Sequence, residues 1–435
     1  MSNARQVLRL APVRRYLAST ALASIGHNIL VTVLFKQVFD LTGDELDIGL
    51  IGLAQFVPAV LLILVSGWVA DRFDRRRVTS LFLFGRVACA VAFVVLSQSG
   101  PTTVWPFLAV AFVLGASDAM MMPARRSIPP LICTQDEFPQ VIALWTATFT
   151  GSSIVGPVLG GFLYAAGPSN AYVIAAALGL ISIVPMLAVV YVREPERVAD
   201  RPTLSAALEG LKFVRRTPIV LASISLDLFA VLFGGAVALI PAVASERLGV
   251  GNIAYGWLRA APGIGAAVMA IWLAMRPVQR RVGPTLLWVV AVFGAGTMVF
   301  GLTRSYTVAF IALVVLSAAD MISMYIRGSI VPLVTPDDQL GRVSAVEGVF
   351  IGASNELGAF ESGVTARAFG LPWSIAGGGF LTIVVAGSFA LLFPSLRKVD
   401  TFAELDPQLA RDAAGARPSP DVSSGVNPGV SPDGG

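Results

Sequence analysis

Long apolar stretches separated by short polar turns dominate the chain. Each stretch is long enough to cross a lipid bilayer, which takes about 20 apolar residues per helix. The pattern therefore predicts an all-α membrane protein with twelve transmembrane helices. The twelve stretches are 16–39, 48–70, 78–98, 104–124, 139–165, 171–191, 219–243, 254–275, 285–302, 306–326, 341–366 and 373–393.

Lysine and arginine are distributed unevenly over the turns between these stretches. The turns after the second, fourth, sixth, eighth and tenth stretches are basic, as are the N-terminal stretch and the tail. Only Arg247, Arg304 and Arg367 lie on the opposite side. Cytoplasmic loops carry the excess of Lys and Arg in membrane proteins, so both termini are predicted to be cytoplasmic. The first stretch has no small-residue cleavage site and is predicted to be an uncleaved helix, not a signal peptide.

The chain repeats itself at a spacing of 202 residues. Two parallel six-helix halves are a transporter architecture, with the substrate bound near the midplane between them. We expect an N-terminal bundle at 1–192, a linker with an amphipathic cytoplasmic helix at 193–218, a C-terminal bundle at 219–396 and a largely disordered cytoplasmic tail at 397–435. The repeated pairs include Asp118 and Asp320, Arg125 and Arg327, Pro130 and Pro332, Gly156 and Gly358, and Gly161 and Gly363.

Composition excludes most soluble classes. Only 13% of the residues are charged and 55% are hydrophobic, whereas soluble proteins carry about 25% charged residues. A soluble enzyme or a nucleic-acid binder is therefore a poor interpretation. One histidine and two cysteines give little material for a metal site or a Ser–His nucleophile. We accordingly expect no catalytic residues, no metal and no cofactor, and ATP-driven transport would need a domain that is missing from the sequence.

The turn after the second stretch is rich in glycine, aspartate and arginine. Residues 67–77 read G-W-V-A-D-R-F-D-R-R-R. Glycine permits close helix packing, aspartate can cap a helix N-terminus, and arginine can hold a carboxylate through two hydrogen bonds. Such a cluster suits a latch between two halves, although a plain positive-inside anchor is the alternative.

This turn resembles the signature loop of the major facilitator superfamily, G-x-x-x-D-R-x-G-R-R, with Asp74 in place of the family's usual glycine. The resemblance implies two six-helix bundles and a cytoplasmic gate. Asp118, Asp320, Arg125 and Arg327 occur in both halves, and we expect them to belong to this gate or to a shared scaffold, with a proton-carrying role as the alternative for the two acids. The gate residues contributed by the turn are Gly67, Asp71, Arg72, Arg75 and Arg76.

The fifth stretch contains closely spaced glycines around a proline. Gly156, Pro157, Gly160 and Gly161 resemble the antiporter motif of exporters in this superfamily. Proline removes a backbone hydrogen bond and glycine lets helices approach closely, so the segment is predicted to be a kinkable interface helix. A simple packing helix is the alternative.

Three further segments indicate which branch of the superfamily the chain resembles. Residues 123–131, 209–216 and 341–344 are similar to the branch that contains enterobactin exporters and related drug-efflux proteins. This implies a multi-pass transporter of the bacterial inner membrane with a small-molecule substrate, protons and the lipid bilayer as partners, and no nucleic acid. The resemblance also implies that the first, fourth, seventh and tenth helices line a central cavity. We expect a monomer.

Ionisable residues inside the apolar stretches are candidates for function because they are costly in lipid. The proton-coupling candidates are Glu356, Asp227, Glu361, His27 and Asp118, with Glu356 first because it lies nearest mid-membrane. Arg259 is expected to pair with Glu356 or Glu361, and Lys36 and Arg86 are expected only to extend toward the membrane surface. The candidates for the substrate cavity are His27, Asn28, Asp227, Arg259, Asn355 and Glu356.

The sequence thus predicts a secondary transporter that exports a small amphipathic compound, a drug or a siderophore-like metabolite, in exchange for protons by alternating access. An importer or a lipid transporter of the same superfamily is the main alternative. A membrane-embedded lipid enzyme is a further alternative, but it predicts catalytic polar residues clustered at one membrane face, and the intramembrane charges are spread across helices and depths. A receptor without transport activity would be supported if vesicles bound ligand but moved none.

Overall fold

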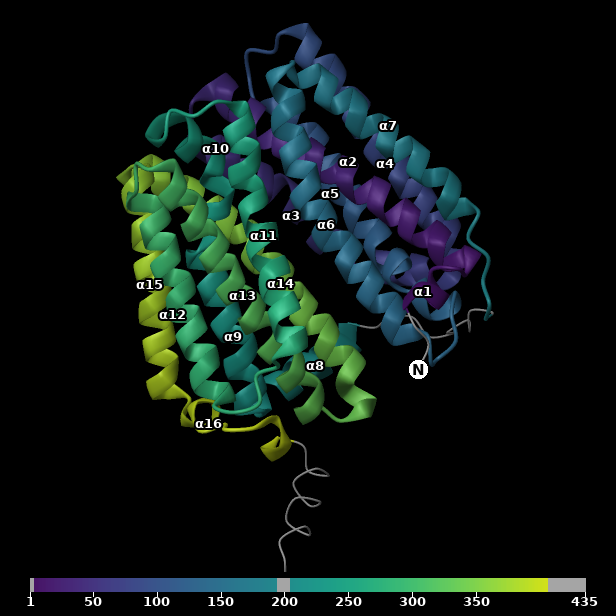
Figure 1. Ribbon diagram of the computed structural model, residues 1–435, viewed down its shortest axis with the longest axis vertical. Helices are drawn as coiled ribbons and strands as arrows, with labels where there is room; N and C mark the ends of the chain where they lie inside the picture. Colours follow the sequence, from purple (N-terminus) through teal and green to yellow (C-terminus); the bar gives the residue numbers. More distant parts are fainter. Residues whose placement is uncertain (1–3, 194–203, 406–435) are drawn as a thin grey trace, which may run out of the picture.

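The computed structural model describes residues 4–193 and 204–405, which form helices without any strand (Figure 1). The linker residues 194–203 and most of the predicted tail, 406–435, lie outside the described residues. The first half consists of α1 (Ala4–Val7), α2 (Ala11–Thr42), α3 (Glu45–Arg72), α4 (Arg75–Ser99), α5 (Trp105–Arg126), the 3-10 turn η1 (Pro129–Leu131), α6 (Phe138–Ala165) and α7 (Pro168–Leu187).

The second half begins with α8 (Leu204–Arg216), which precedes the transmembrane helices. After the transmembrane helices come two short elements, α16 and η4, near the C-terminal end of the described chain. The elements are α9 (Pro218–Phe233), η2 (Gly235–Leu239), α10 (Ile240–Ala242), η3 (Val243–Arg247), α11 (Asn252–Met275), α12 (Val282–Leu302), α13 (Tyr306–Val334), α14 (Asp337–Phe369), α15 (Leu371–Leu392), α16 (Pro394–Arg397) and η4 (Phe402–Glu404).

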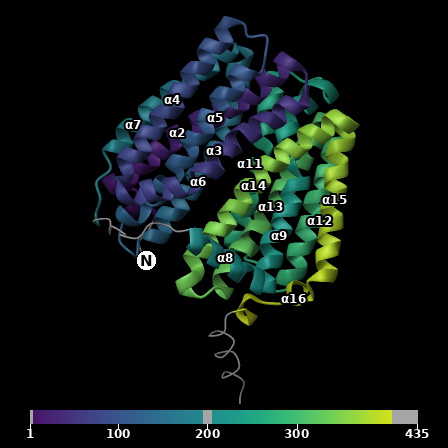
Figure 2. The ribbon, with the colours of Figure 1, turned by 180° about the vertical axis from the view of Figure 1, so that it is seen from behind.

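The helices pack as two bundles that lie side by side, α2–α7 in one and α9–α15 in the other (Figures 1 and 2). We call them the N-bundle and the C-bundle. The helices α1, α8 and α16 all lie at one end of the molecule, named here the terminus end, and the opposite end is the far end. Each of the twelve predicted stretches contains a helix, because a chain in lipid must satisfy its backbone hydrogen bonds within each segment.

Eleven helices in the described part of the chain are long and apolar enough to cross a membrane. The remaining predicted span is α14, which is 33 residues long but carries Glu347, Glu356 and Glu361 in its middle. Those charges lower its hydropathy below that of the other spans, although α14 packs between α3 and α9 within the molecule. The predicted all-α fold class is therefore confirmed, and the predicted span that is not apolar enough to count among the eleven is the one that carries the most acidic residues.

Two pairs of helices join the bundles through small residues. Across α6 and α11, a Cβ placed on Gly256 would lie 2.8 Å from the carbonyl oxygen of Pro157 and 2.9 Å from the Cα of Gly161. Across α3 and α14, a Cβ on Gly363 would lie 3.1 Å from the Cα of Gly49. Such distances leave room only for glycine, which allows helix backbones to approach closely in lipid.

The glycines of the predicted antiporter motif all face a neighbouring helix. A Cβ on Gly156 would lie 2.4 Å from the Cβ of Asn28, and one on Gly160 would lie 3.2 Å from the Cβ of Thr32, both in α2. Gly161 faces α11 instead. The motif thus lies where α2, α6 and α11 meet, in agreement with an interface helix.

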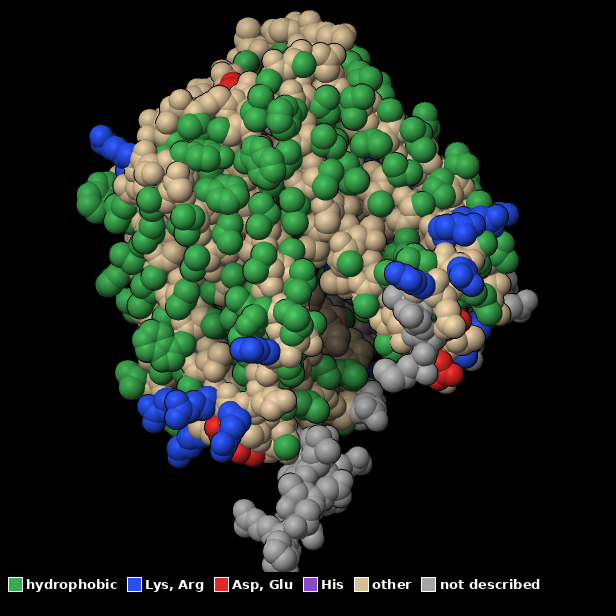
Figure 3. Space-filling model, viewed as in Figure 1, with side chains coloured by type: hydrophobic (Ala, Val, Ile, Leu, Met, Phe, Trp, Pro, Cys, Tyr) green, Lys and Arg blue, Asp and Glu red, His purple; other side chains and the backbone are tan. Residues whose placement is uncertain are grey.

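All polar links between the bundles, within the described residues, lie toward the far end. Lys36 Nζ donates to Ser245 Oγ at 3.1 Å, Tyr255 donates its hydroxyl proton to the backbone oxygen of Thr32 at 2.8 Å, and Arg367 pairs with Asp44 at 3.1 Å. At the terminus end the surface is hollowed between the bundles (Figure 3). The far end is therefore closed and the terminus end is open.

The first helix of the C-bundle is broken. The α-helix α9 ends at Phe233, and the chain continues through the 3-10 segment η2, a single turn α10 and the π-helical turn η3. Gly235 lies at the break, where a Cβ would come 2.5 Å from the carbonyl oxygen of Gly358 in α14. The close approach of α14 explains why a glycine is required there.

The linker helix α8 packs against helices of the C-bundle. Val214 is buried and belongs to an apolar cluster with Val220 and Val331, while Arg342 of α14 pairs with Glu209 at 2.6 Å. Lys212, Arg215 and Arg216 are exposed. The predicted amphipathic helix is present, but at Val214 its apolar side is covered by α9 and α14.

Candidate functional site: the central cavity

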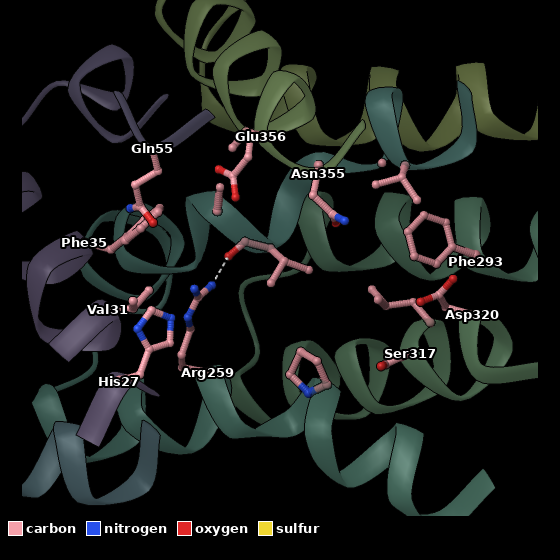
Figure 4. A pocket seen from close by; sticks show the side chains of 18 residues that line it. His27, Val31, Phe35, Gln55, Arg259, Phe293, Ser317, Asp320, Asn355 and Glu356 are labelled. Atoms are coloured by element: carbon pink, nitrogen blue, oxygen red, sulfur yellow. Dashed lines mark hydrogen bonds between the residues drawn. The ribbon is translucent and has the colours of Figure 1, made fainter. Parts of the chain in front are cut away.

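A cavity of about 370 Å³ lies between the two bundles (Figure 4). Its walls come from α2 and α3 of the N-bundle and from the broken helix, α11, α12, α13 and α14 of the C-bundle. No residue of α5 lines it, although the resemblance implied that the fourth transmembrane helix would. The lining residues are His27, Val31, Phe35, Gln55, Val231, Gly234, Gly235, Val237, Ala238, Arg259, Pro262, Phe293, Leu316, Ser317, Asp320, Asn355, Glu356 and Ala359.

Three charged side chains line this cavity without an ion-pair partner. Arg259 and Glu356 project toward the same part of the cavity as His27 and Gln55, whereas Asp320 lies beside Phe293 at the other side of the view (Figure 4). The predicted pairing of Arg259 with Glu356 or Glu361 is therefore wrong for this conformation. An unpaired charge inside a membrane protein is costly, so its presence at a cavity marks a place for a ligand or a proton.

Arg259 is held by the break in the first C-bundle helix. Its Nη1 donates to the carbonyl oxygen of Val237 at 2.9 Å, which satisfies an acceptor that a continuous helix would have used internally. The guanidinium also lies 5.3 Å from the ring centroid of Phe35 in the N-bundle, within the range of a cation–π contact.

Glu356 projects from the C-bundle against the N-bundle. It is half-buried, and its Oε2 lies so close to α3 that a Cβ on Gly52 would be 3.2 Å away. Asn355 is exposed to the cavity, and its amide donates to the backbone oxygen of Ile351 at 2.8 Å. The carboxylate thus lies at the boundary between the two bundles.

Two predicted cavity residues lie elsewhere. Asn28 is not among the lining residues, because it faces Gly156 in α6. Asp227 is buried and pairs with Arg327 through Oδ1 and Nη2 at 2.7 Å, so neither side chain is available to a ligand. The predicted proton-coupling candidate Glu361 also does not line the cavity.

The repeated aspartates have different surroundings in the two halves. Asp118 pairs with Arg86 and lies 3.8 Å from His27, whereas Asp320 has no ion pair and lines the cavity. The position that corresponds to Arg86 in the repeat is Trp288, which is 73% exposed and supplies no charge. Asp320 was predicted to belong to the gate or a shared scaffold, with a proton-carrying role as the alternative, and the structure places it on the cavity wall.

The repeated arginines differ as well. Arg327 is neutralised by the buried Asp227, whereas Arg125 bonds to α2 through the backbone oxygen of Thr20 at 3.3 Å and Ser24 Oγ at 3.2 Å. Both arginines are buried. They join the fourth helix of each bundle to the first, which agrees with the predicted scaffold role.

The turn at residues 67–77 makes its contacts within the N-bundle half of the chain. Asp74 caps α4, since its side chain accepts from the backbone N–H of Arg76 at 2.9 Å, and its φ of −60° explains why no glycine is needed there. Arg76 pairs with Asp74 at 2.6 Å and donates to the backbone oxygen of Val189 at 2.7 Å. Its guanidinium lies 4.3 Å from the ring centroid of Tyr191.

The remaining gate candidates also stay within the N-bundle. Arg75 lies 4.0 Å from Asp71 and donates to the backbone oxygen of Ser127 at 3.3 Å, while Arg72 lies over the ring of Trp68. Gly67 lies one turn from the end of α3. None of these side chains bonds to the C-bundle among the described residues, which fits a terminus end that is open.

The charge of Arg76 stabilises the ionised form of Asp74. The side-chain hydrogen bond from Arg76 lowers the pKa of Asp74 from 3.8 to about 2, against an opposing effect of burial. Burial raises the pKa of Tyr191, which lies against the same pair, to about 12. The cap is therefore a fixed charge at neutral pH.

We expect Asp74→Ala to lower the free energy of unfolding by about 1 kcal/mol, the usual cost of losing an N-cap. Because the folded-state pKa is lowered, the stabilisation is complete above the ordinary pKa of 3.8 and is lost as the pH falls toward 2. Asp74→Asn should keep the cap but lose this pH dependence. Thermal unfolding in detergent between pH 6 and pH 3 measures both effects, and equal stabilities of Asp74→Ala and the parent protein would contradict the prediction.

The matches to known proteins agree with this arrangement. A family model described as Major Facilitator Superfamily matches residues 16–353. The chain belongs to the Major Facilitator Superfamily. As a superfamily member it is a multi-pass membrane transporter and not an enzyme, and the predicted family is confirmed.

Curated relatives of this superfamily member are distant but cover most of its length. It is 25% identical over 397 residues to the uncharacterized MFS-type transporter YfiS of Bacillus subtilis (strain 168), covering 86% of this chain and 88% of the relative. It is 26% identical over 378 residues to the enterobactin exporter EntS of Escherichia coli O1:K1 / APEC, covering 84% of this chain and 86% of the relative.

Solved structures share the fold at lower identity. A POT family transporter in complex with 5-aminolevulinic acid has a TM-score of 0.72 at 11% identity, covering 89% of this chain and 96% of that one. A bacterial homolog of the human lysosomal transporter Spinster has a TM-score of 0.67 at 15% identity, covering 92% of this chain and 99% of that one.

Sequence reasoning missed four residues of this superfamily member that the structure places at important positions. Gln55 and Phe293 line the cavity, but an uncharged side chain in an apolar helix gives no distinct signal. Arg86 and Lys36 were expected only to extend toward the surface, yet Arg86 pairs with Asp118 and Lys36 joins the bundles at the far end. A buried charge requires a partner. The position of Arg86 and Lys36 inside apolar stretches was therefore the signal that could have shown that each has one.

We expect Gly161→Ala to destabilise the conformation that is closed at the far end. The added Cβ would lie 2.6 Å from the carbonyl oxygen of Asn252 and 2.7 Å from the Cα of Gly256, and overpacking of this kind costs about 1–3 kcal/mol. A cysteine at Asn355, in the cavity, should therefore react about tenfold faster with a membrane-impermeant thiol reagent added from the far side.

The matched control for this prediction is Gly151→Ala. Gly151 lies on the same helix, and a Cβ there would meet no atom within 4 Å. The native Cys89 and Cys133 are buried, so they should contribute little background. An unchanged labelling rate in Gly161→Ala would show that the α6–α11 contact does not control far-end closure.

Proposed function

We propose that this protein is a proton-coupled exporter of small amphipathic organic compounds, drugs or siderophore-like metabolites, which works by alternating access in the bacterial inner membrane. The observation that carries the proposal is Glu356, a half-buried carboxylate on the cavity wall that has no ion-pair partner. A carboxylate in such a place can bind a proton or a cationic group of a substrate, but it is unfavourable as an isolated charge.

The charges of the cavity wall support exchange of substrate for protons. With Asp320 and Glu356 ionised and His27 neutral, the wall carries two negative charges against the single positive charge of Arg259. A compound with a cationic group is attracted in this state. Protonation of Glu356 removes one negative charge and weakens that attraction, so proton and substrate compete for the cavity.

The arrangement of the bundles supports alternating access. If the basic terminus end faces the cytoplasm, the structure is an inward-facing state that receives its substrate from the cytoplasm. Opening toward the outside then requires the loss of the three far-end links, Lys36 with Ser245, Tyr255 with Thr32 and Arg367 with Asp44. The small-residue contacts of α6–α11 and α3–α14 provide surfaces on which the bundles can rock.

Size and similarity support the substrate class. A cavity of about 370 Å³ is within the range of about 300–1,000 Å³ found for pockets that bind drug-sized molecules. Phe35 and Phe293 supply apolar wall next to the charged groups. The similarity to an enterobactin exporter supports export, and a siderophore-like compound is one member of the class.

The test uses the purified protein in liposomes with an imposed pH gradient and a panel of fluorescent dyes and siderophores. We expect substrate movement to drive proton movement in the opposite direction and to stop when a protonophore is added. Proton and substrate movement in the same direction would favour an importer. Transport that ignores the gradient would refute proton coupling, and movement of labelled lipid alone would favour a lipid transporter.

A further inference from the structure

His27 separates two spaces in the protein. Its ring lines the central cavity (Figure 4) and also a second space of about 20 Å³, which Arg86 and Gly179 border as well. The side chain is 27% exposed, but Nδ1 is completely buried and has no hydrogen-bond partner. Nε2 makes no hydrogen bond to a described residue either, but unlike Nδ1 it is not fully buried. One ring nitrogen is thus open to the cavity and the other faces the interior of the N-bundle.

The buried nitrogen faces a carboxylate. Nδ1 of His27 lies 3.8 Å from Oδ2 of Asp118, and this oxygen accepts no hydrogen bond. The other oxygen, Oδ1, accepts from Nε of Arg86 in α4. Asp118 is therefore paired with the arginine through one oxygen and still has a free acceptor on the side of the histidine.

We propose that His27, Asp118 and Arg86 form a second proton-binding site on the N-bundle wall of the cavity, in addition to Glu356. A carboxylate facing Nδ1 favours the tautomer with hydrogen on Nδ1 and leaves the lone pair of Nε2 directed to the cavity. A proton from cavity water binds at Nε2, and the imidazolium is stabilised by Asp118. No other bond has to break, because Asp118 stays ionised and paired with Arg86. The inference rests on the proposed proton coupling for its role in transport, whereas the proton site itself does not.

The neighbouring charges link this site to Glu356. They come from every charged element around the ring, with Arg86 on α4, Arg125 and Asp118 on α5, Arg259 on α11, Asp320 on α13 and Glu356 on α14. Three cations face three carboxylates, so the protonation state of Glu356 decides the net charge around His27. Ionised Glu356 favours a charged His27, and protonated Glu356 disfavours it. The cavity thus holds a single proton, on His27 or on Glu356, more readily than it holds one proton on each.

The single histidine of the chain makes the site directly measurable. Protein labelled with ¹⁵N-histidine, purified through a histidine-free tag and placed in lipid nanodiscs, should give one imidazole signal whose ¹⁵N shifts report tautomer and charge. We expect the neutral ring to carry hydrogen on Nδ1 and to become charged between pH 5 and pH 9. Asp118→Asn should lower the titration midpoint by about 1 pH unit or more, and Arg86→Gln should raise it by a similar amount.

Two further variants complete the test. Glu356→Gln should lower the midpoint by less than Asp118→Asn, because Glu356 lies on the other wall, and Glu361→Gln, outside the cavity on the same helix, should leave it unchanged. Partial unfolding would move every variant toward the midpoint of free histidine, about 6.5. Opposite shifts for Asp118→Asn and Arg86→Gln therefore cannot arise from instability. If Asp118→Asn does not fold, the shift in Arg86→Gln supports the proposal only when that variant unfolds at the same temperature as the parent protein.

The proposal is overturned if the signal stays unchanged from pH 5 to pH 9, if the neutral ring carries hydrogen on Nε2, or if the midpoint ignores Arg86→Gln. Its failure is distinguishable from failure of the proposed function. Gradient-insensitive transport in liposomes would refute proton coupling even with the expected titration, whereas a silent histidine with gradient-driven transport would leave Glu356 as the coupling site and remove this one.

Discussion

Glu356→Gln is expected to reduce gradient-driven transport to the level of protein-free liposomes. Glutamine has the size of glutamate but cannot bind and release a proton, so this position of the cavity wall keeps one charge state throughout the cycle. The carboxylate is half-buried against α3 and has no ion-pair partner to lose, so the variant should fold normally. Exchange of labelled for unlabelled substrate without a gradient, which needs no proton movement, should persist.

The matched control for this variant is Glu361→Gln. Glu361 lies on the same helix but does not line the cavity, and its replacement should leave gradient-driven transport near that of the parent protein. Loss of both driven transport and exchange in Glu356→Gln would indicate a role in substrate binding alone. Full driven transport in that variant would contradict the assignment of Glu356 as a proton site and would direct attention to Asp320.

Asp227→Asn is expected to destabilise the protein by about 3–5 kcal/mol, because it leaves the charge of Arg327 buried without a partner. Both side chains are almost completely buried and their charged atoms are 2.7 Å apart. The remaining bond of Arg327, from Nε to Ser323 Oγ at 3.2 Å, cannot neutralise a guanidinium. The yield of folded protein and the midpoint of thermal unfolding in detergent measure the loss.

The double variant Asp227→Leu with Arg327→Met distinguishes structure from transport. Replacing both partners of a buried ion pair by apolar residues is often neutral or stabilising, so folding should recover. Driven transport that recovers with it would show that the pair is a scaffold between α9 and α13. A stable but inactive double variant would return Asp227 to the proton-coupling candidates, and a stable Asp227→Asn would contradict the burial argument.

The general architecture was predictable from the sequence because the bilayer leaves few alternatives. A chain in lipid has to satisfy its backbone within helices, so the apolar stretches directly predict the spans. The exception, α14, was still recognised as a span although its acidic residues leave it out of the eleven described helices that are apolar enough to cross a membrane. The repeat of 202 residues predicts two similar halves, and Glu356, Arg259 and His27 were recognisable because a charged or titratable side chain is unusual at that depth.

Which of the charged residues reach the cavity was decided only by the tertiary structure. Asp227 and Asp320 are both acids in apolar stretches of the same half, yet one is neutralised by Arg327 and the other lines the cavity. Asp118 and Asp320 even share a position in the repeat, but only Asp118 has an arginine beside it, because Trp288 stands at the position of Arg86.

The physical reason is that pairing depends on the rotation and spacing of neighbouring helices. A sequence shows that Asn28 is mid-span, but not that it faces Gly156 and is thereby turned from the cavity. It shows a basic turn, but not that Arg76 is bonded within its own bundle while the far end is closed by Lys36 and Arg367. The sequence alone thus determined the helices, the two halves and the set of costly charges. The packing of helices against one another determined which charges neutralise each other and which remain free at the cavity.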